Sequence, residues 1–183
     1  FVLSKTPGNT VSNLSSTRAL RDVTNNHNCH YNASAVGEVN VVEKMKETNA
    51  VIGGEGNGGI IYPELHYGRD ALIGIALFLT QLAERKLSVS DLRKTYPNYY
   101  ISKNKIELTP KIDVDKILEL LKEKYKNEQI TTIDGLKIDF EDGWVHLRKS
   151  NTEPIIRVYA ECQGKDKANS FAENMIDEIK NLI

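Results

Sequence analysis

The stretch that decides the fold of the C-terminal part is "ITTIDGLKIDFEDGWVHLRKSNTEPIIRVYAE", residues 130–161. Apolar and polar residues alternate along it, and clusters of Asp, Gly, Asn and Pro interrupt it, so it predicts three or four antiparallel strands. A further strand is predicted before it, over 105–110, and amphipathic helices are predicted over 114–126 and 166–183. Strand, helix, strands and helix without a parallel crossover predict an α+β domain, an antiparallel sheet with two helices on one face.

The N-terminal part differs, because predicted helices and strands alternate from residue 11 to about residue 98. Such alternation predicts an α/β layered domain with a mixed sheet. The segment 69–86 is apolar nearly all round and is therefore predicted to be a buried helix. The polar stretch 95–105 reads as a turn-rich connection, so we place the domain boundary near Tyr100, with domains over 1–99 and 100–183.

Composition restricts the classes of function. The 183 residues carry a net charge of -1, from 24 Lys and Arg against 25 Asp and Glu. This balance argues against nucleic-acid or membrane-surface binding, both of which favour a basic excess. The two cysteines, Cys29 and Cys162, lack the spacing of a disulfide framework, so we expect a reducing compartment, the cytoplasm. The chain begins without an initiator methionine, in what reads as the end of a strand, so we expect part of a longer protein.

The segment "RKSNTEPIIR", residues 148–157, is a polar hairpin tip between two predicted strands. Successive strand residues face opposite sides, so Arg148 and Arg157 are expected on one outer face, with Trp144, His146 and Tyr159. Three consecutive residues add hydroxyl and amide donors: Ser150, Asn151 and Thr152. Because guanidinium groups bind phosphate oxygens through two parallel hydrogen bonds, the tip predicts a phosphate site.

A solvated hairpin with incidental arginines is the alternative for this tip, because polar turns are common. The acidic Glu153 favours that alternative. A phosphate site requires Glu153 to point away from the bound anion.

A second motif, "VIGGEGNGGIIYPE", follows a predicted strand. Its glycines Gly54, Gly56 and Gly59 have the spacing of a dinucleotide-binding turn, but that turn must open directly into a helix, and "IIYPE" is strand-like. Glu55 would also repel a phosphate. We interpret the loop as a sugar-contact loop in which Glu55 and Asn57 hydrogen-bond to hydroxyl groups; a plain glycine-rich turn is the alternative.

Metal binding and covalent chemistry find little support in the sequence. His27, Cys29 and His30 lie within four residues, but zinc normally needs three or four ligands and no second cluster is present. No Asp-Gly-Asp metal loop and no Ser/His/Asp constellation is evident. We therefore predict neither a metal ligand nor a catalytic residue in this chain.

The two motifs also resemble those of a known family. The pattern from Arg148 to Pro154 is similar to the phosphate-binding loop of the α-D-phosphohexomutases, Arg-x-Ser-Asn-Thr-x-Pro. "GGEGNGG" (53–59) followed by "GRDA" (68–71) is similar to their sugar-binding loop. Both occur in the family's order, and the resemblance covers the whole chain as the C-terminal half of such an enzyme, its third and fourth domains.

The resemblance implies roles for individual residues. Contacts to the sugar are implied for the glycine-loop residues Glu55, Asn57, Gly54 and Gly58. The phosphate that does not react would be held by Arg148, Ser150, Asn151, Thr152 and Arg157. The segment "AVGEVNVV" (35–42) is similar to a family loop that approaches the substrate, so Gly37 and Glu38 are additional candidates.

The family's phosphoserine and magnesium-binding aspartates belong to its first two domains. The resemblance thus implies that Mg²⁺ and a hexose 1,6-bisphosphate act in the full-length enzyme, and that this chain alone is inactive. Its partners would be a phosphorylated hexose and the N-terminal half of the same polypeptide, with no nucleic acid and no membrane. The expected reaction interconverts hexose 1-phosphate and 6-phosphate.

The glycine loop departs from the family's usual Gly-Glu-x-Ser-Gly-His, because Asn57 replaces the serine and Gly59 the histidine. This variant resembles phosphoglucosamine mutases, which implies glucosamine phosphate as the substrate. Glucose and mannose phosphates are the alternatives. A non-catalytic phosphosugar-binding module is the alternative from another class.

Overall fold

The computed structural model describes residues 1–108, 112–150 and 153–182. The chain divides into two compact units, Phe1–Pro97 and Asn98–Ile183. Each unit has its own sheet and its own helices. They are described separately below.

The first unit contains a sheet and five helices among its described residues. Its strands are β1 (Thr10–Asn13), β2 (Tyr31–Ser34), β3 (Ile52–Gly54) and β4 (Ile60–Ile61). Its helices are α1 (Val2–Lys5), α2 (Ala19–Asn26), α3 (Glu38–Thr48), α4 (Ala71–Arg85) and α5 (Val89–Lys94). The first residues, expected as the end of a strand, therefore form a short helix instead.

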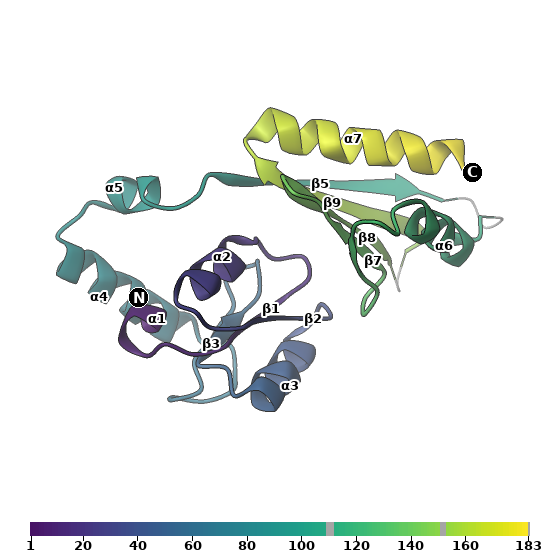
Figure 1. Cartoon of the computed structure of the whole chain (residues 1–183). Coiled ribbons are helices and arrows are strands. Elements are labelled where there is room, and N and C mark those ends of the chain that lie inside the picture. The colour runs from purple at the N-terminus through teal and green to yellow at the C-terminus, as the bar shows by residue number, and fades with distance from the viewer. Residues whose placement is uncertain (109–111, 151–152, 183) are drawn as a thin grey trace. The chain divides into compact units, whose positions relative to one another are not determined.

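The sheet of this unit has the order β2-β1-β3-β4. The first three strands are parallel, and β4 is antiparallel to β3. Helices α2 and α3 cover opposite faces of the sheet (Figure 1). The core beneath α3 is formed by buried residues of the helix and the strands: Val11, Val41, Met45, Ala50 and Ile61. The predicted α/β layered domain with a mixed sheet is confirmed.

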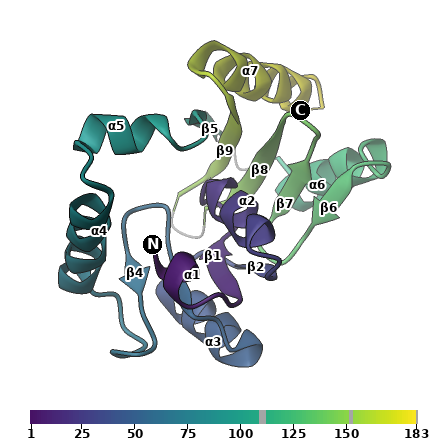
Figure 2. The same cartoon turned by 60° about the vertical axis from the view of Figure 1, so that its left-hand side comes forward.

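Helix α4 lies beside β4 (Figure 2). It begins where the Asp70 side chain accepts hydrogen bonds from the backbone N–H groups of Leu72 and Ile73. The prediction of a buried helix is wrong for this unit, because large apolar side chains of α4 are exposed, Leu72 by 77%. An apolar pattern identifies the helix but not what covers it. In the described part of the chain, no helix combines the length and apolar character needed to cross a membrane.

The second unit contains a five-stranded sheet and two helices among its described residues. Its strands are β5 (Tyr99–Glu107), β6 (Gln129–Thr131), β7 (Leu136–Asp139), β8 (Gly143–Lys149) and β9 (Ile155–Gln163). Its helices are α6 (Val114–Lys124) and α7 (Lys165–Asn181).

The second sheet has the order β5-β9-β8-β7-β6, and all neighbouring strands are antiparallel. Both helices lie on one face of it (Figure 1), and the core joins them to the inward side chains of the strands. On α6 the fully buried anchor is Leu121, and on α7 it is Ile179. The predicted α+β domain with both helices on one face is confirmed.

Two local predictions for this unit are wrong. The stretch 95–105, expected as a polar connection, enters the nine-residue strand β5, which pairs with β9 along its whole length. The apolar spacing of the C-terminal helix also predicts a buried Leu182, but this residue lies beyond the end of α7 and is 41% exposed.

Candidate functional site

The glycine loop connects β3 to β4 as a tight hairpin turn. The Glu55 N–H donates to the Gly59 carbonyl (2.9 Å), and the Gly58 N–H donates to the Glu55 carbonyl (3.1 Å). Gly58 has a φ of +92°, a conformation that side chains disfavour, and a Cβ at Gly54 would lie 2.2 Å from the Gly59 carbonyl oxygen. The loop opens into a strand, so it lacks the helix that a dinucleotide-binding turn requires.

The Glu55 carboxylate points inward rather than presenting itself to solvent. Its side chain is only 6% exposed. One oxygen accepts a hydrogen bond from the Asn13 side-chain amide (3.0 Å), and the other lies 3.5 Å from Nη1 of Arg69. Glu55 lines a cavity of about 170 Å³ together with residues that follow β1, including Ser16 and Thr17. The carboxylate is thus held in a fixed position at the edge of a small cavity.

Arg69 joins the glycine loop to the start of α3. Its Nε donates to Glu38 Oε2 (2.8 Å), and its backbone N–H donates to Glu38 Oε1 (3.1 Å). These contacts, the backbone one first, hold the pKa of Glu38 below its ordinary value. Gly37, with a φ of +124°, begins α3 beside Glu38. The structure therefore links Glu38 and Glu55 through Arg69, and Gly37 directly precedes Glu38.

Asn57 lies at the exposed tip of the loop. Its side-chain oxygen accepts a hydrogen bond from the Gly59 backbone N–H (3.0 Å), so the amide side chain stabilises its own turn. A Cβ at Gly59 would lie 2.6 Å from Cδ of Arg69, so the present position of Arg69 depends on a glycine there. A histidine at this position, as in the usual family loop, would require Arg69 to move.

Two residues of this network, Asn13 and Arg69, were missed by the sequence analysis. Asn13 is the last residue of β1, a strand flanked by parallel neighbours, and ligand sites in such sheets lie beyond the carboxyl ends of the strands. That rule could have identified Asn13. Arg69 was part of a quoted motif, but no local pattern indicates its two carboxylate partners.

The hairpin between β8 and β9 places its arginines as predicted. Arg148 pairs directly with Arg157 across the two strands, and His146 pairs with Tyr159, so these side chains share the face opposite the helices. The described ends of the tip are joined by a hydrogen bond from the Ser150 N–H to the Ile155 carbonyl (3.0 Å). The predicted phosphate ligands Asn151 and Thr152 lie outside the described residues.

Both arginines have carboxylate partners in the structure. Arg148 Nε lies 3.1 Å from Asp134 Oδ1, and Arg157 Nη2 lies 3.9 Å from Glu153 Oε2. Glu153 therefore lies beside Arg157, and the requirement that it point away from a bound anion is not met in this structure. Glu153 is 58% exposed and its contact with Arg157 is long, so the pair is weak and a bound anion would compete with it.

A cavity of about 510 Å³ lies on this face of the sheet, and we call it the lysine pocket. It is lined by Lys103, Lys105, Glu153, Ile155, Arg157 and Tyr159. The two lysines were missed because residues 95–105 were expected as a connection and the strand was predicted only over 105–110, whereas β5 spans Tyr99–Glu107. Their alternation in "SKNK" indicates a shared face only once the strand is known.

The same sheet face is buried toward the other end of β8. Trp144 Nε1 donates to Glu161 Oε1 (2.8 Å), and both side chains are fully buried. Nε2 of His146 lies 2.7 Å from the Asp134 carbonyl oxygen, and burial lowers the pKa of His146 to about 4. His146 is therefore uncharged at neutral pH, because its pKa lies well below 7.

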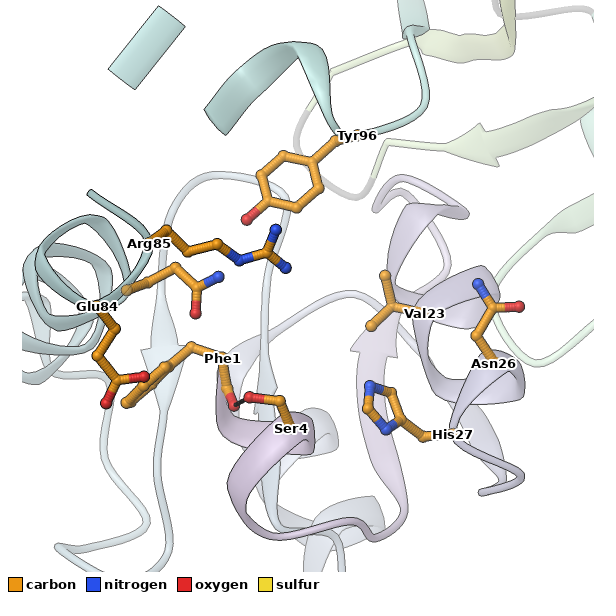
Figure 3. Close-up of a pocket in the computed structure, with 9 residues that line it drawn as sticks. Phe1, Ser4, Val23, Asn26, His27, Glu84, Arg85 and Tyr96 are labelled. Atoms are coloured by element: carbon orange, nitrogen blue, oxygen red, sulfur yellow. Dashed lines mark hydrogen bonds between the residues drawn. The ribbon is translucent and has the colours of Figure 1, made fainter. Parts of the chain in front are cut away.

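Other parts of the molecule do not add a second candidate site. A cavity of about 420 Å³ in the first unit is lined by Phe1, Ser4, His27, Arg85 and Tyr96, among others, and contains none of the predicted site residues (Figure 3). Within residues 1–108, 112–150 and 153–182, no group of three or more His, Cys, Asp or Glu side chains could hold a metal ion. Neither Cys29 nor Cys162 forms a disulfide bond with another described residue.

Both units match known domains. Residues 2–100 match "Phosphoglucomutase/phosphomannomutase, alpha/beta/alpha domain III", and residues 104–178 match "Phosphoglucomutase/phosphomannomutase, C-terminal domain". The phosphoglucosamine/phosphogalactosamine mutase of Sulfurisphaera tokodaii is 35% identical over 175 residues, which are 94% of this chain but 38% of that protein. The chain therefore spans less than half the length of this relative.

Solved structures agree with the sequence matches. A phosphoglucomutase/phosphomannomutase family protein from Burkholderia thailandensis superimposes with a TM-score of 0.79 at 26% identity, covering 98% of this chain and 39% of its own. The N-acetylphosphoglucosamine mutase of Aspergillus fumigatus shares the fold at 13% identity, with a TM-score of 0.63 over 98% of this chain and 39% of its own. That fungal protein has been solved in complex with glucose 1,6-bisphosphate and, separately, with GlcNAc-6P and magnesium.

Proposed function

Because the chain belongs to the phosphoglucomutase/phosphomannomutase family, we propose that it is the substrate-holding part of a phosphohexomutase. The complete enzyme would interconvert hexose 1-phosphate and hexose 6-phosphate through a bisphosphorylated intermediate, as an intramolecular phosphotransferase. The residues of this chain would bind and orient the sugar phosphate and would not react with it.

The observation that carries the proposal is the pairing of Arg148 with Arg157 on one face of the β8–β9 hairpin. Two guanidinium groups beside a polar tip favour a phosphate dianion, whose oxygens accept paired charge-assisted hydrogen bonds. Ser150, Asn151 and Thr152 would add donors at the tip. Holding the phosphate that does not react fixes the position of the opposite end of the sugar, which is catalysis by positioning.

Glu55 and Asn57 would accept hydrogen bonds from sugar hydroxyls. Gly54 and Gly58 would shape the turn that presents them. Gly37 and Glu38 would lie at the edge of the sugar site. The contacts of Glu55 with Asn13 and Arg69 support this role, because they hold the carboxylate in place before the sugar arrives. Such preorganisation reduces the entropy lost on binding. The side-chain oxygen of Asn57 has two lone pairs, so it can accept from a hydroxyl while it accepts from the Gly59 N–H.

We expect this chain alone to be inactive. The phosphoserine and the magnesium ligands of the family belong to domains that the chain does not match, and its described residues contain no cluster that fits a metal. Magnesium, which would polarise the transferring phosphoryl group, and a hexose 1,6-bisphosphate are therefore proposed only for the complete enzyme. The complexes of the fungal relative support both assignments.

Glucosamine phosphate is our proposed substrate, supported by the Asn57 and Gly59 variant of the loop and by the aminosugar mutase from S. tokodaii. The test is the activity of the complete protein on glucosamine, glucose and mannose phosphates. We expect the highest kcat/KM for glucosamine phosphate, and a clear preference for mannose phosphate would refute the choice. Binding without turnover of any of the three would instead favour a phosphosugar-binding module. We place this activity in the cytoplasm, in keeping with two cysteines that form no disulfide bond with a described residue.

A further inference from the structure

Three cations lie in a row across three neighbouring strands of the second sheet. Lys105 on β5 pairs with Arg157 on β9, and Arg157 pairs with Arg148 on β8. Like charges that face each other on adjacent strands destabilise a sheet. A row of three such cations therefore indicates an anionic ligand or strong local compensation.

Arg148 is compensated by Asp134 at 3.1 Å, but the compensation of Lys105 and Arg157 is weak. Lys105 Nζ lies 3.3 Å from Glu107, whose side chain is 80% exposed, and the Arg157–Glu153 contact is 3.9 Å long. Exposed pairs of this kind contribute little and are screened by salt. The two carboxylates therefore leave most of the positive potential of Lys105 and Arg157 available to a ligand.

The lysine pocket lies over this row. Its volume of about 510 Å³ falls in the range of small-molecule sites and exceeds the needs of a bare phosphate. Its side walls come from Lys103, whose Nζ lies 5.6 Å from the centre of the Tyr159 ring, and from Glu153. The three cations of the lining, Lys103, Lys105 and Arg157, outnumber its one carboxylate, Glu153, so the pocket favours an anionic group.

We propose that the lysine pocket is part of the phosphate site, with Lys105 and Arg157 as binding residues and Glu153 as a resident carboxylate that competes with the phosphate. The proposal rests on the proposed function, since it names further residues of the same site. Lys105 supplies a point charge from the edge strand, and Arg157 supplies a planar pair of donors. Binding of phosphate displaces the Glu153 carboxylate from Arg157.

Edge protection is the other role that lysines on an edge strand fulfil. β5 is the outermost strand of its sheet, and edge lysines discourage pairing with other chains. That role predicts that loss of Lys105 changes aggregation but not phosphate affinity. Edge protection also predicts that Glu153 has no effect on phosphate affinity. Substitutions of Lys105 and of Glu153 therefore distinguish the two explanations.

The test is calorimetric titration of the 183-residue chain with glucosamine 6-phosphate and with inorganic phosphate, at low salt. Lys105→Gln should weaken binding of both by roughly three- to tenfold, and Glu153→Gln should strengthen it by about threefold, as expected for single exposed charges. The matched control is Lys126→Gln, which removes an equally exposed lysine of the same unit, also paired with a carboxylate, and should change affinity less than twofold.

The outcomes separate this inference from the proposed function. If the unmodified chain binds neither ligand, or if Arg148→Gln binds as well as the unmodified chain, the proposed function fails. If the chain binds and Arg148→Gln weakens binding, but Lys105→Gln and Glu153→Gln behave like the Lys126 control, only the inference about the lysine pocket is refuted. Aggregation of Lys105→Gln with unchanged affinity would likewise refute it and assign the lysine to edge protection.

Discussion

Replacing Arg69 by glutamine tests the network that holds the Glu55 carboxylate of the glycine loop. The substitution removes the guanidinium that lies 2.8 Å from Glu38 and 3.5 Å from Glu55, and it leaves a similar stem that still fits beside Gly59. Glu55 then keeps only its Asn13 contact while its side chain stays 6% exposed. A buried carboxylate that loses one of two partners destabilises the folded loop.

The magnitude follows from the exposure of the two partners. Exposed ion pairs contribute roughly 0.2–1 kcal/mol, and removing one partner of a fully buried pair costs roughly 3–5 kcal/mol. Arg69 is 47% exposed and Glu55 is 6% exposed, so the pair lies between these limits. We expect the free energy of opening the glycine loop to fall by about 1–2 kcal/mol, which increases the open fraction about 5- to 30-fold.

Hydrogen exchange of the backbone amides measures this directly. The N–H groups of Glu55, Gly58 and Asp70 are hydrogen-bonded across the loop and should exchange faster in Arg69→Gln by the factor given above. Arg69→Lys should recover part of the protection, because it restores the charge but not the planar fork. The control Lys94→Gln removes an exposed pair of the same unit and should leave the loop unchanged. Unaltered protection in Arg69→Gln would show that Arg69 does not hold the loop.

Further predictions concern the turn and the support beneath Arg148. Gly54→Ala should lower the free energy of unfolding of the first unit by about 2 kcal/mol or more, because its Cβ would lie 2.2 Å from a backbone oxygen. The melting temperature, followed by circular dichroism, should fall by several degrees. In the control Gly56→Ala the nearest atom lies 3.3 Å from the Cβ, so the melting temperature should fall less. His146 has a folded pKa of about 4, below its ordinary 6.5, so the unfolded chain takes up the proton first and stability falls as pH drops from 6.5 to 4. The difference of 2.5 units between the two pKa values corresponds to a loss of roughly 3 kcal/mol in the free energy of unfolding. The His146→Gln protein should lose less of this free energy between pH 6.5 and pH 4. Urea unfolding, followed by the fluorescence of Trp144, the only tryptophan, measures the loss. An identical pH dependence in both proteins would exclude His146 as the cause.

Local rules predicted the features that depend on neighbouring residues. Strand alternation placed Arg148 and Arg157 on one face, because the period of two applies within each strand and the short tip sets the register. The strand-like "IIYPE" predicted that the glycine loop opens into β4 rather than a helix. The same local patterns identified both layered architectures.

Features that depend on distant partners could not be predicted. Glu55 is buried through Asn13 and Arg69, which lie 42 residues before it and 14 residues after it, so nothing near Glu55 indicates its contacts. Lys103 and Lys105 lie on the same sheet face as Arg157 only because β5 pairs with β9, more than 50 residues later. Glu153 lies 3.9 Å from Arg157, and the polar-turn pattern does not reveal that contact.

A crystal structure of the 183-residue chain with glucosamine 6-phosphate would test the central claim most directly. The account predicts that the phosphate oxygens lie within hydrogen-bonding distance of the guanidinium groups of Arg148 and Arg157, at about 2.7–3.2 Å. It also predicts that the Glu153 carboxylate has moved away from Arg157. A phosphate bound elsewhere, with Arg148 and Arg157 still paired to Asp134 and Glu153, would contradict the assignment of this hairpin as the phosphate site.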